Sequence, residues 1–311
     1  MEKRQIGKSG LWVNPIGFGA NAVGGHNIYG PLDESAGKAV MRAAIEAGVD
    51  FIDTAFIYGP ERSEVLVGEV IREMGVRNQV VLATKDAYRF TDDGVVFDNS
   101  PDFLRECVDA CLRRLQTDYI DLFYIHQPDE NTPKDQAVAA LQELKAEGKI
   151  RAIGVSNFSL AQLEEANRNG GVDAVQNQYS LLVRDAEKDV LSYAAREGIT
   201  FVPYFPLASG LLAGKYRPET RFADHRADNP LFQGEAFQRN LEKVEQLRPI
   251  ARAHGAEVGH IALAWCLSRN GIDAIIPGAK DKAQLQSNLK AGQVQLSEAE
   301  INRIDRLFAP E

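Results

Sequence analysis

The residues of this sequence that could do chemistry stand where short apolar runs end. Asp53 ends the run GVDFID, Lys85 ends VVLATK and His126 ends IDLFYIH, while Tyr58 follows Asp53 closely. An ammonium beside a phenol favours the phenolate and lowers the tyrosine pKa, and a buried ammonium itself needs an anion. We therefore expect Asp53, Lys85 and Tyr58 to form a general acid, with a neutral His126 orienting a substrate oxygen.

Such a group suits proton donation to a carbonyl oxygen that gains negative charge, as hydride addition requires. Taken singly, Asp53 could cap a turn, Lys85 could reach solvent and His126 could be a satisfied core histidine. Their occurrence together favours a site. A metal-dependent or Schiff-base enzyme using Lys85 is the weaker alternative, because an adjacent Asp and Tyr suit charge tuning better than imine formation.

The elements that must position these residues alternate along the chain. Apolar runs typical of parallel strands covered on both faces alternate with amphipathic stretches typical of helices. The expected strands lie in PIGFGA, GVDFIDT, QVVLATK, YIDLFYIH, IRAIGVSN, VDAVQNQ, ITFVPYFP and DAIIPGA. The expected helices span residues 33–47, 63–74, 101–115, 133–147, 159–169, 185–197, 258–269, 282–290 and 297–307.

Eight strand–helix units predict an α/β fold, a closed (β/α)₈ TIM barrel, with an N-terminal β-hairpin cap within RQIGKSGLWV. A doubly wound open sheet is the alternative. TIM barrels carry their sites on loops at the C-terminal face of the strands. The non-periodic stretch 215–238 is expected to be such a long loop, and the 311 residues are expected to form one domain, residues 1–311.

Composition limits the expected partners. The formal net charge of −9 disfavours binding to nucleic acid or to an anionic membrane. Cys107 and Cys111 are interpreted as buried apolar residues, and no metal site is expected because no cluster with ligand spacing accompanies them. Without a signal peptide or a long apolar run, a cytoplasmic location is expected. The oligomeric state is left open.

Longer motifs resemble the aldo-keto reductase family, in particular its bacterial general-stress-reductase and potassium-channel β-subunit branches. They cover nearly the whole chain and include GFGANAVGG, DTAFIYGPERSEVLVGE, LKAEGKIRAIGVSNFS, PLASGLLAGKY and IIPGAKDKAQLQSNL. The resemblance implies a catalytic tetrad of Asp53, Tyr58, Lys85 and His126. It implies NADP(H)-dependent reduction of a small aldehyde or ketone with Tyr58 as general acid. The alternative is a cofactor-binding redox sensor or regulatory subunit with slow turnover.

The resemblance also assigns cofactor ligands. Ser156, Asn157 and Gln176 would bind the nicotinamide carboxamide, and Tyr204 would stack on its ring. The stretch 207–215 would hold the diphosphate, and 278–288 the adenosine phosphate. The full expected set is Gly19, Ala20, Asp53, Ser156, Asn157, Gln176, Tyr204, Leu207, Ser209, Lys215, Gly278, Ala279, Lys280, Gln284 and Asn288.

The residues themselves support an anion site near Lys280. Lys280 precedes an expected helix, whose unpaired N–H groups and dipole favour an anion. Many family members carry Arg where this chain has Lys280, and a lysine grips a phosphate without the bidentate fork. We therefore expect the 2′-phosphate of NADP(H) beside Lys280, with Arg221 as a second source of charge.

Three further features each have competing interpretations. GFGANAVGG has the spacing GxGxxxxG, and no acidic residue completes a Rossmann unit, so Gly19 and Ala20 are expected to lie under the nicotinamide instead. Tyr29, Phe56 and Phe90 would form an aromatic mouth if they converge, although ordinary packing explains each equally well. Gln178 is a weaker cofactor candidate than Gln176.

Overall fold

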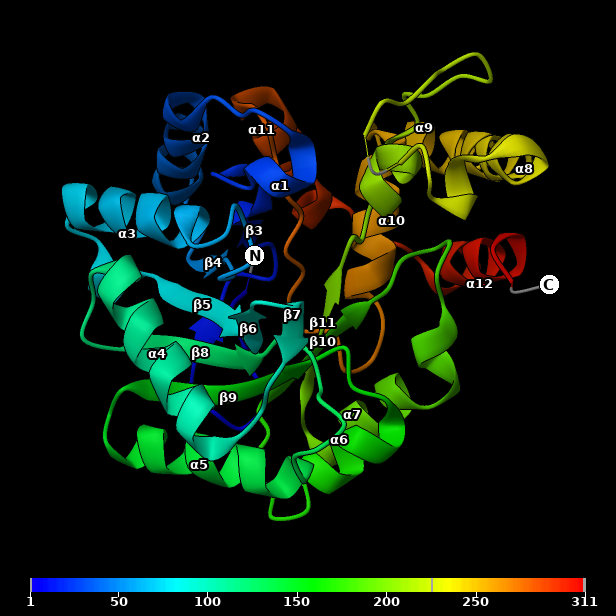
Figure 1. Ribbon diagram of the computed structural model, residues 1–311. Helices are drawn as coiled ribbons and strands as arrows, with labels where there is room; N and C mark the ends of the chain where they lie inside the picture. Colours follow the sequence, from blue (N-terminus) through cyan, green and yellow to red (C-terminus); the bar gives the residue numbers. More distant parts are fainter. Residues whose placement is uncertain (1, 225, 310–311) are drawn as a thin grey trace.

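The computed structural model describes residues 2–224 and 226–309, and its centre is a curved parallel sheet (Figure 1). Seven strands pair in the order β11-β10-β9-β8-β5-β4-β3. They are β3 (Phe18–Gly19), β4 (Phe51–Asp53), β5 (Val81–Asp86), β8 (Ile120–Ile125), β9 (Ile150–Ser156), β10 (Ala174–Gln178) and β11 (Thr200–Tyr204). The predicted TIM-barrel architecture is confirmed by this sheet and by its helices.

The eighth expected strand closes the barrel without forming a regular ladder. Isolated parallel bridges join Ile16 to Ile275 and Gly19 to Gly278, so the run DAIIPGA lies beside the first strand. Pro277 has no N–H to donate within that run, which prevents a continuous ladder. The seam therefore brings residues from near both ends of the chain together at the rim of the barrel.

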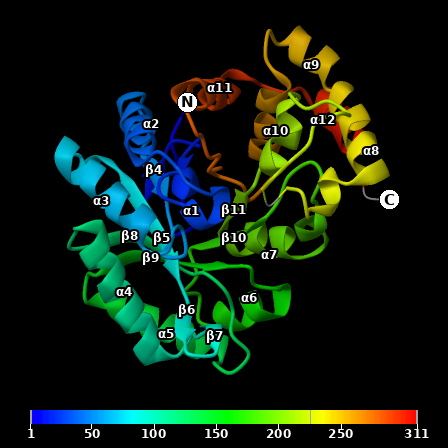
Figure 2. The same ribbon diagram turned by 45° about the horizontal axis from the view of Figure 1, so that its top comes forward.

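Helices surround the strands in a ring (Figure 2). They are α2 (Glu34–Glu46), α3 (Arg62–Met74), α4 (Pro101–Leu115), α5 (Lys134–Ala146), α6 (Leu160–Ala166), α7 (Val190–Glu197), α10 (Val258–Leu267) and α11 (Lys282–Lys290). The final helix, α12 (Glu298–Leu307), lies within the expected range 297–307 and begins with a capping box at Ser297. The expected helix 185–197 is interrupted at Asp189, whose extended φ of −153° separates the 3₁₀ turn η3 (Asp185–Lys188) from α7.

An N-terminal hairpin closes the end of the barrel where the strands begin. It consists of the antiparallel β1 (Arg4–Gln5) and β2 (Trp12–Val13), and the Gly7 N–H donates to Thr200 Oγ1 at the start of β11 (2.8 Å). Inside the barrel the Tyr124 ring lies against Gly154, where a Cβ would come within 2.2 Å of a ring carbon. The interior is therefore packed, and space for a ligand is left at the opposite end.

Several elements were not expected from the sequence. A hairpin of β6 (Tyr88–Thr91) and β7 (Gly94–Phe97) follows β5 directly. Helices α8 (Gly234–Glu245) and α9 (Arg248–Ala253) lie outside the ring, beside α12 (Figures 1 and 2). The expected loop 215–238 is therefore shorter than predicted, since α8 begins within it. A short helix, α1 (His26–Tyr29), follows the first strand.

The loop that precedes α8 is held by aromatic packing. Tyr216, Phe222 and Phe232 meet edge to face, with ring centroids 5.0 Å apart for Tyr216–Phe222 and for Phe222–Phe232. Phe237 of α8 continues the same cluster. Residue 225 of this loop lies outside the described residues. Within the described residues, no helix combines the length and apolar character needed to cross a bilayer.

Two interior helical glycines with opposite surroundings test the packing of the ring. A Cβ at Gly68 of α3 would stand 2.5 Å from the carbonyl oxygen of Leu115, whereas a Cβ at Gly37 of α2 would have its nearest neighbour at 3.4 Å. We expect Gly68→Ala to lower the free energy of unfolding by about 1–3 kcal/mol, because α4 must shift. Gly37→Ala should raise it by about 0.5–1 kcal/mol through helix propensity. Urea unfolding measures both, and a stabilised Gly68→Ala protein would contradict the assigned close approach.

Candidate active site

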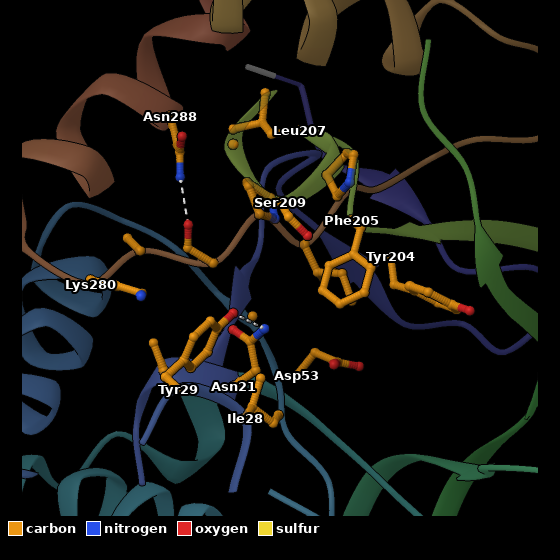
Figure 3. Close-up of a pocket in the computed structure, with 18 of the residues that line it drawn as sticks. Asn21, Ile28, Tyr29, Asp53, Tyr204, Phe205, Leu207, Ser209, Lys280 and Asn288 are labelled. Atoms are coloured by element: carbon orange, nitrogen blue, oxygen red, sulfur yellow. Dashed lines mark hydrogen bonds between the residues drawn. The ribbon is translucent and has the colours of Figure 1, made fainter. Parts of the chain in front are cut away.

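A cavity of about 710 Å³ opens where the barrel strands end, and most of the expected site residues line it (Figure 3). Those that do are Gly19, Asp53, Tyr58, His126, Ser156, Asn157, Gln176, Tyr204, Leu207, Ser209, Lys215, Gly278, Ala279, Lys280, Gln284 and Asn288. Two expected residues are not in its wall. Ala20 is fully buried and its carbonyl oxygen accepts from Ser63 Oγ (3.0 Å), and Lys85 is buried behind the lining residue Asp53, to which it is paired.

An ion pair between neighbouring strands forms the base of the site. Lys85 Nζ of β5 lies 2.5 Å from Asp53 Oδ1 of β4 and donates to the Thr54 carbonyl oxygen (2.7 Å). Each of the two charged side chains is 1% exposed. Gln176 Nε2 reaches across from β10 and donates to Asp53 Oδ2 (3.0 Å). Both carboxylate oxygens are therefore bound, and the Lys85 charge has a partner, as a buried ammonium requires.

Tyr58 keeps its proton in this arrangement. Its pKa is raised, first by burial and then by the negative charge of Asp53 and by Tyr88. The prediction that Lys85 lowers the Tyr58 pKa is wrong. The Lys85 ammonium lies 5.3 Å from the centre of the Tyr58 ring, but the charge of Lys85 is already offset by Asp53. The result is a phenol that remains protonated at neutral pH beside an ammonium.

His126 contributes a neutral imidazole to the same wall. Burial, and then the positive charge of Lys85, hold its pKa well below the ordinary value. Its ring meets the rings of Tyr58 and Tyr88 edge to face, at centroid distances of 6.4 and 5.2 Å. Among the described residues its buried Nδ1 has no hydrogen-bond partner. The side chain is therefore not the satisfied core histidine of the alternative interpretation.

A hydrogen-bonded row continues from His126 along the rim. Asn157 Nδ2 donates to the His126 carbonyl oxygen (3.0 Å), and Tyr204 Oη donates to Asn157 Oδ1 (2.9 Å). Asn157 adopts a left-handed φ of 62°, which asparagine tolerates better than most residues. Ser156 Oγ donates to the Gln176 carbonyl oxygen (2.8 Å). The strand-end residues predicted from β9, β10 and β11 are thus brought together.

Cationic side chains gather at the far end of the cavity. Lys280 Nζ lies 4.1 Å from the ring centre of Tyr29, and Lys215 and Arg226 line the same cavity (Figure 3 labels Lys280 and Tyr29). Burial lowers the pKa of Lys280, and the positive charges of Arg226 and Lys215 lower it further, while Asp224 opposes them. Because the three cations repel one another, this end of the cavity favours an anion.

Arg221 was expected to supply a second positive charge beside Lys280, but the structure places Arg226 there instead. Arg221 is exposed, donates to the carbonyl oxygens of Pro218 and Thr220, and does not line the cavity. Arg226 lines it instead, held by Asp224 and by the Tyr216 hydroxyl (2.5 Å). The sequence spacing of two arginines in one loop does not indicate which of them turns inward.

The start of α11 differs from the expected anion site. Asp281 caps the helix, accepting from the Gln284 N–H (2.8 Å), and Gln284 Oε1 accepts from the Lys280 N–H (3.1 Å). These N–H groups are bonded within the chain, so the side-chain charge of Lys280 carries the attraction for an anion here. Asn288 Nδ2 donates to the Gly278 carbonyl oxygen (3.1 Å), which fixes the preceding loop on the helix (Figure 3).

Further residues complete the wall. Some of them lie within expected stretches without having been named: Gly210, Ala213, Tyr216, Arg226, Ala283 and Ser287. The others lie outside those stretches: Asn21, Ala22, Ile28, Ile57, Tyr88, Gln127, Phe205, Pro206, Glu257, Ile276 and Pro277, together with Tyr29, which was considered for an aromatic mouth. Phe56 and Phe90 pack on each other (5.7 Å) and do not line the cavity, and neither does Gln178. Adjacency to a strand-end residue is the signal that could have identified Gln127, which follows His126.

The alternative chemistries lack a structural basis in the described residues. Lys85 is an ion-paired ammonium outside the cavity wall, so it is not placed as a Schiff-base nucleophile. No group of three or more His, Cys, Asp or Glu side chains in residues 2–224 and 226–309 could hold a metal. Cys107 and Cys111 are buried on α4, and burial raises the pKa of both thiols.

The sequence was compared with known families and proteins. A family model described as "Aldo/keto reductase family" matches residues 15–309. The chain is 39% identical to aldo-keto reductase YhdN of Bacillus subtilis, covering 92% of this chain and 87% of that protein. It is 35% identical to aldo-keto reductase yakc [NADP(+)] of Schizosaccharomyces pombe, covering 97% of this chain and 89% of that protein. It is 33% identical to NADH-specific methylglyoxal reductase of Escherichia coli, covering 96% of this chain and 96% of that protein.

The fold was compared with solved structures. The glycerol dehydrogenase AKR11B4 from Gluconobacter oxydans superposes with a TM-score of 0.91 at 31% sequence identity, covering 99% of this chain and 95% of that one. This likeness extends over the barrel, the hairpin and the outer helices alike.

Asp53 and Lys85 should contribute to the free energy of unfolding as a pair, so that the effect of changing one depends on the presence of the other. We expect Asp53→Asn to lower the free energy of unfolding by about 3–5 kcal/mol, because Lys85 is left as an uncompensated buried charge. Adding Lys85→Met should restore much of that loss.

Urea unfolding of the wild type, both single variants and the double variant at pH 7 measures this coupling. Equal losses in Asp53→Asn and in the double variant would contradict it.

Proposed function

The chain belongs to the aldo/keto reductase family, and from this premise we propose that it reduces aldehyde or ketone carbonyls with NADP(H), using Tyr58 as the general acid. One observation carries the proposal: a protonated Tyr58 and a neutral His126 share a cavity wall above the buried Asp53–Lys85 pair. This is an oxidoreductase site built without a Rossmann unit or a metal cluster in the described residues.

The residues present fit a nicotinamide dinucleotide. Gly278 and Asn21 both line the cavity, and a Cβ at Gly278 would stand 2.7 Å from Asn21 Oδ1, so only glycine fits at this point of the wall. The cationic end formed by Lys215, Arg226 and Lys280 suits its phosphates. We assign Ser156, Asn157 and Gln176 to the carboxamide and Tyr204 to the nicotinamide face. When bound there, the dinucleotide supplies the hydride that the carbonyl carbon receives.

The protein residues handle the proton. Tyr58 gives its hydroxyl proton to the carbonyl oxygen as that oxygen gains negative charge. The phenolate left behind lies beside the Lys85 ammonium, which Asp53 holds in place, and Tyr58 is then reprotonated from solvent. His126, neutral at physiological pH, donates a ring N–H to the same oxygen and orients it.

The preference for NADPH over NADH rests on the cationic end of the cavity. Named relatives differ, because one carries NADP(+) in its name and another is called NADH-specific. In this chain Lys280 is flanked by Arg226 and Lys215, whose charges lower its pKa. An additional phosphate beside these side chains reduces their mutual repulsion, so we propose that Lys280 binds the 2′-phosphate.

Tyr58→Phe removes only the proposed proton donor. We expect turnover of a reactive aldehyde with NADPH to fall by at least about 10², the usual scale of acid–base catalysis, with little change in the Kd for NADPH. Tyr119→Phe is a matched control, because Tyr119 stacks on Arg77 and Arg151 (3.8 and 3.7 Å) and does not line the cavity. Steady-state kinetics test this, and near wild-type turnover in Tyr58→Phe would reject the assignment.

Lys280→Met should weaken NADPH binding by about ten- to a hundred-fold while changing the Kd for NADH much less, because NADH lacks the 2′-phosphate. Lys282→Met is the control, since Lys282 is exposed at the start of α11 and does not line the cavity. Quenching of protein fluorescence gives both dissociation constants. Equal weakening of the two dinucleotides, or a wild type that prefers NADH, would show that Lys280 does not bind the 2′-phosphate.

A further inference from the structure

The segment 54–61, which joins β4 to α3 and carries Tyr58, is bound to β5 through its first residues. The Thr54 N–H donates to the Ala83 carbonyl oxygen (2.9 Å), and the Phe56 N–H donates to the Lys85 carbonyl oxygen (3.0 Å). These two bonds fix the backbone as far as Phe56. Tyr58 lies further along, in a turn whose conformation the strand does not set.

The turn that follows Tyr58 has an unfavourable backbone conformation. Glu61 has a φ of 68°, in the left-handed region that residues other than glycine rarely adopt. Its N–H donates to the Phe56 carbonyl oxygen (2.6 Å), and the Ser63 N–H donates to the Tyr58 carbonyl oxygen (3.0 Å). Such a conformation persists only where the surrounding structure imposes it. The turn therefore needs contacts from outside the segment.

Arg114 of the neighbouring helix α4 supplies contacts of this kind. Its Nε lies 2.5 Å from Glu64 Oε2, and its Nη1 lies 3.5 Å from Glu61 Oε1. Its guanidinium carbon lies over the Phe56 ring, 5.1 Å from the ring centre. Phe56 precedes Tyr58 in the chain, whereas Glu61 and Glu64 follow it. One guanidinium therefore contacts the chain on both sides of Tyr58.

The same guanidinium also faces the end of β5. Arg114 Nη2 lies 3.8 Å from Oδ2 of Asp86, the last residue of that strand. The Asp86 carbonyl oxygen accepts from the His126 N–H (3.0 Å). Arg114 thus connects the segment that carries Tyr58 with the strand end that holds the backbone of His126.

Stability alone does not account for a buried ion pair at this place. The Arg114 side chain is 12% exposed and that of Glu64 is 0% exposed, and Thr84 Oγ1 also donates to Glu64 (2.5 Å). Apolar side chains of similar volume can often replace such a pair without loss of stability. They would not supply direction, whereas a planar guanidinium that lies over a ring and binds a carboxylate has few orientations open to it.

We propose that Arg114 is a positioning residue for Tyr58, which it holds where the phenol can give its proton to the substrate carbonyl oxygen. Arg114 acts through Phe56, Glu61 and Glu64, and it does not itself line the cavity. The inference rests on the proposed function, because it takes Tyr58 to be the general acid. A displacement of about 1 Å in a reacting group can cost of order 10² in rate, so the effect belongs in kcat and not in dinucleotide binding.

Arg114→Lys tests the inference, because it keeps a positive charge for Glu64 and removes the planar group over Phe56. We expect kcat for 4-nitrobenzaldehyde with NADPH to fall by about three- to thirtyfold, with an unchanged Kd for NADPH. Slower proton transfer should also raise the solvent deuterium isotope effect on kcat, which a smaller folded fraction would leave unchanged. Arg113→Lys is the matched control, since Arg113 is exposed on the same helix.

The Tyr58→Phe background shows whether Arg114 acts through Tyr58. In that background, measured in single turnovers with excess enzyme, Arg114→Lys should change the residual rate little, because the group that it positions is gone. Phe56→Leu removes the ring from the other side of the contact and should behave in the same way. It provides the answer if the thermal midpoint shows that Arg114→Lys does not fold.

Two results would overturn the inference while the proposed function stands. One is a wild-type kcat in Arg114→Lys and Phe56→Leu, and the other is an equal fold loss in the wild-type and Tyr58→Phe backgrounds. Near wild-type turnover in Tyr58→Phe alone would overturn the proposed function, and this inference with it.

Discussion

The buried ion pair between Asp53 and Lys85 is the constraint on which the rest of the site depends. Neither charge is tolerated in the barrel without the other, so the ends of β4 and β5 must lie in one register. The second oxygen of Asp53 binds Gln176 from β10 on the far side of the sheet, which extends the same constraint across the barrel mouth. Burial is the first cause of the raised pKa of Tyr58 and of the lowered pKa of His126, and the pair adds to both shifts: the charge of Asp53 raises the Tyr58 pKa, and the charge of Lys85 lowers the His126 pKa.

The cavity separates two kinds of chemistry along its length. One end concentrates positive charge in a chain whose formal net charge is −9, so attraction for a phosphate is a local property of Lys215, Arg226 and Lys280. At the other end the paired Lys85 leaves no cation in the described wall, and Tyr88 and Gln127 provide uncharged hydrogen-bonding groups. A ligand that carries phosphates and a ligand that carries a neutral carbonyl can therefore occupy the cavity in one relative order.

The sequence predicted those features that depend on local patterns. Asp53, Lys85 and His126 stand at strand ends because the apolar runs before them are strands, and α12 lies within the expected helix range 297–307. Features that depend on how distant segments meet were missed or wrong. The direction of the Tyr58 pKa shift is set by burial and by a charge already neutralised across two strands, and no spacing along the chain reveals either. The choice of Arg226 over Arg221 depends on a loop conformation fixed by aromatic packing.

The seam of the barrel has a consequence for synthesis of the chain. Gly19 and Gly278 are bridged to each other and both line the cavity, so residues near the two ends of the sequence share one binding wall. The residues of the early strands and of the Asp53–Lys85 pair are made well before the seam residue Gly278. The cavity cannot be complete until Gly278 and α11 have been made. Ligand binding therefore reports that translation has reached the last helices, and it stabilises only chains in which the barrel has closed.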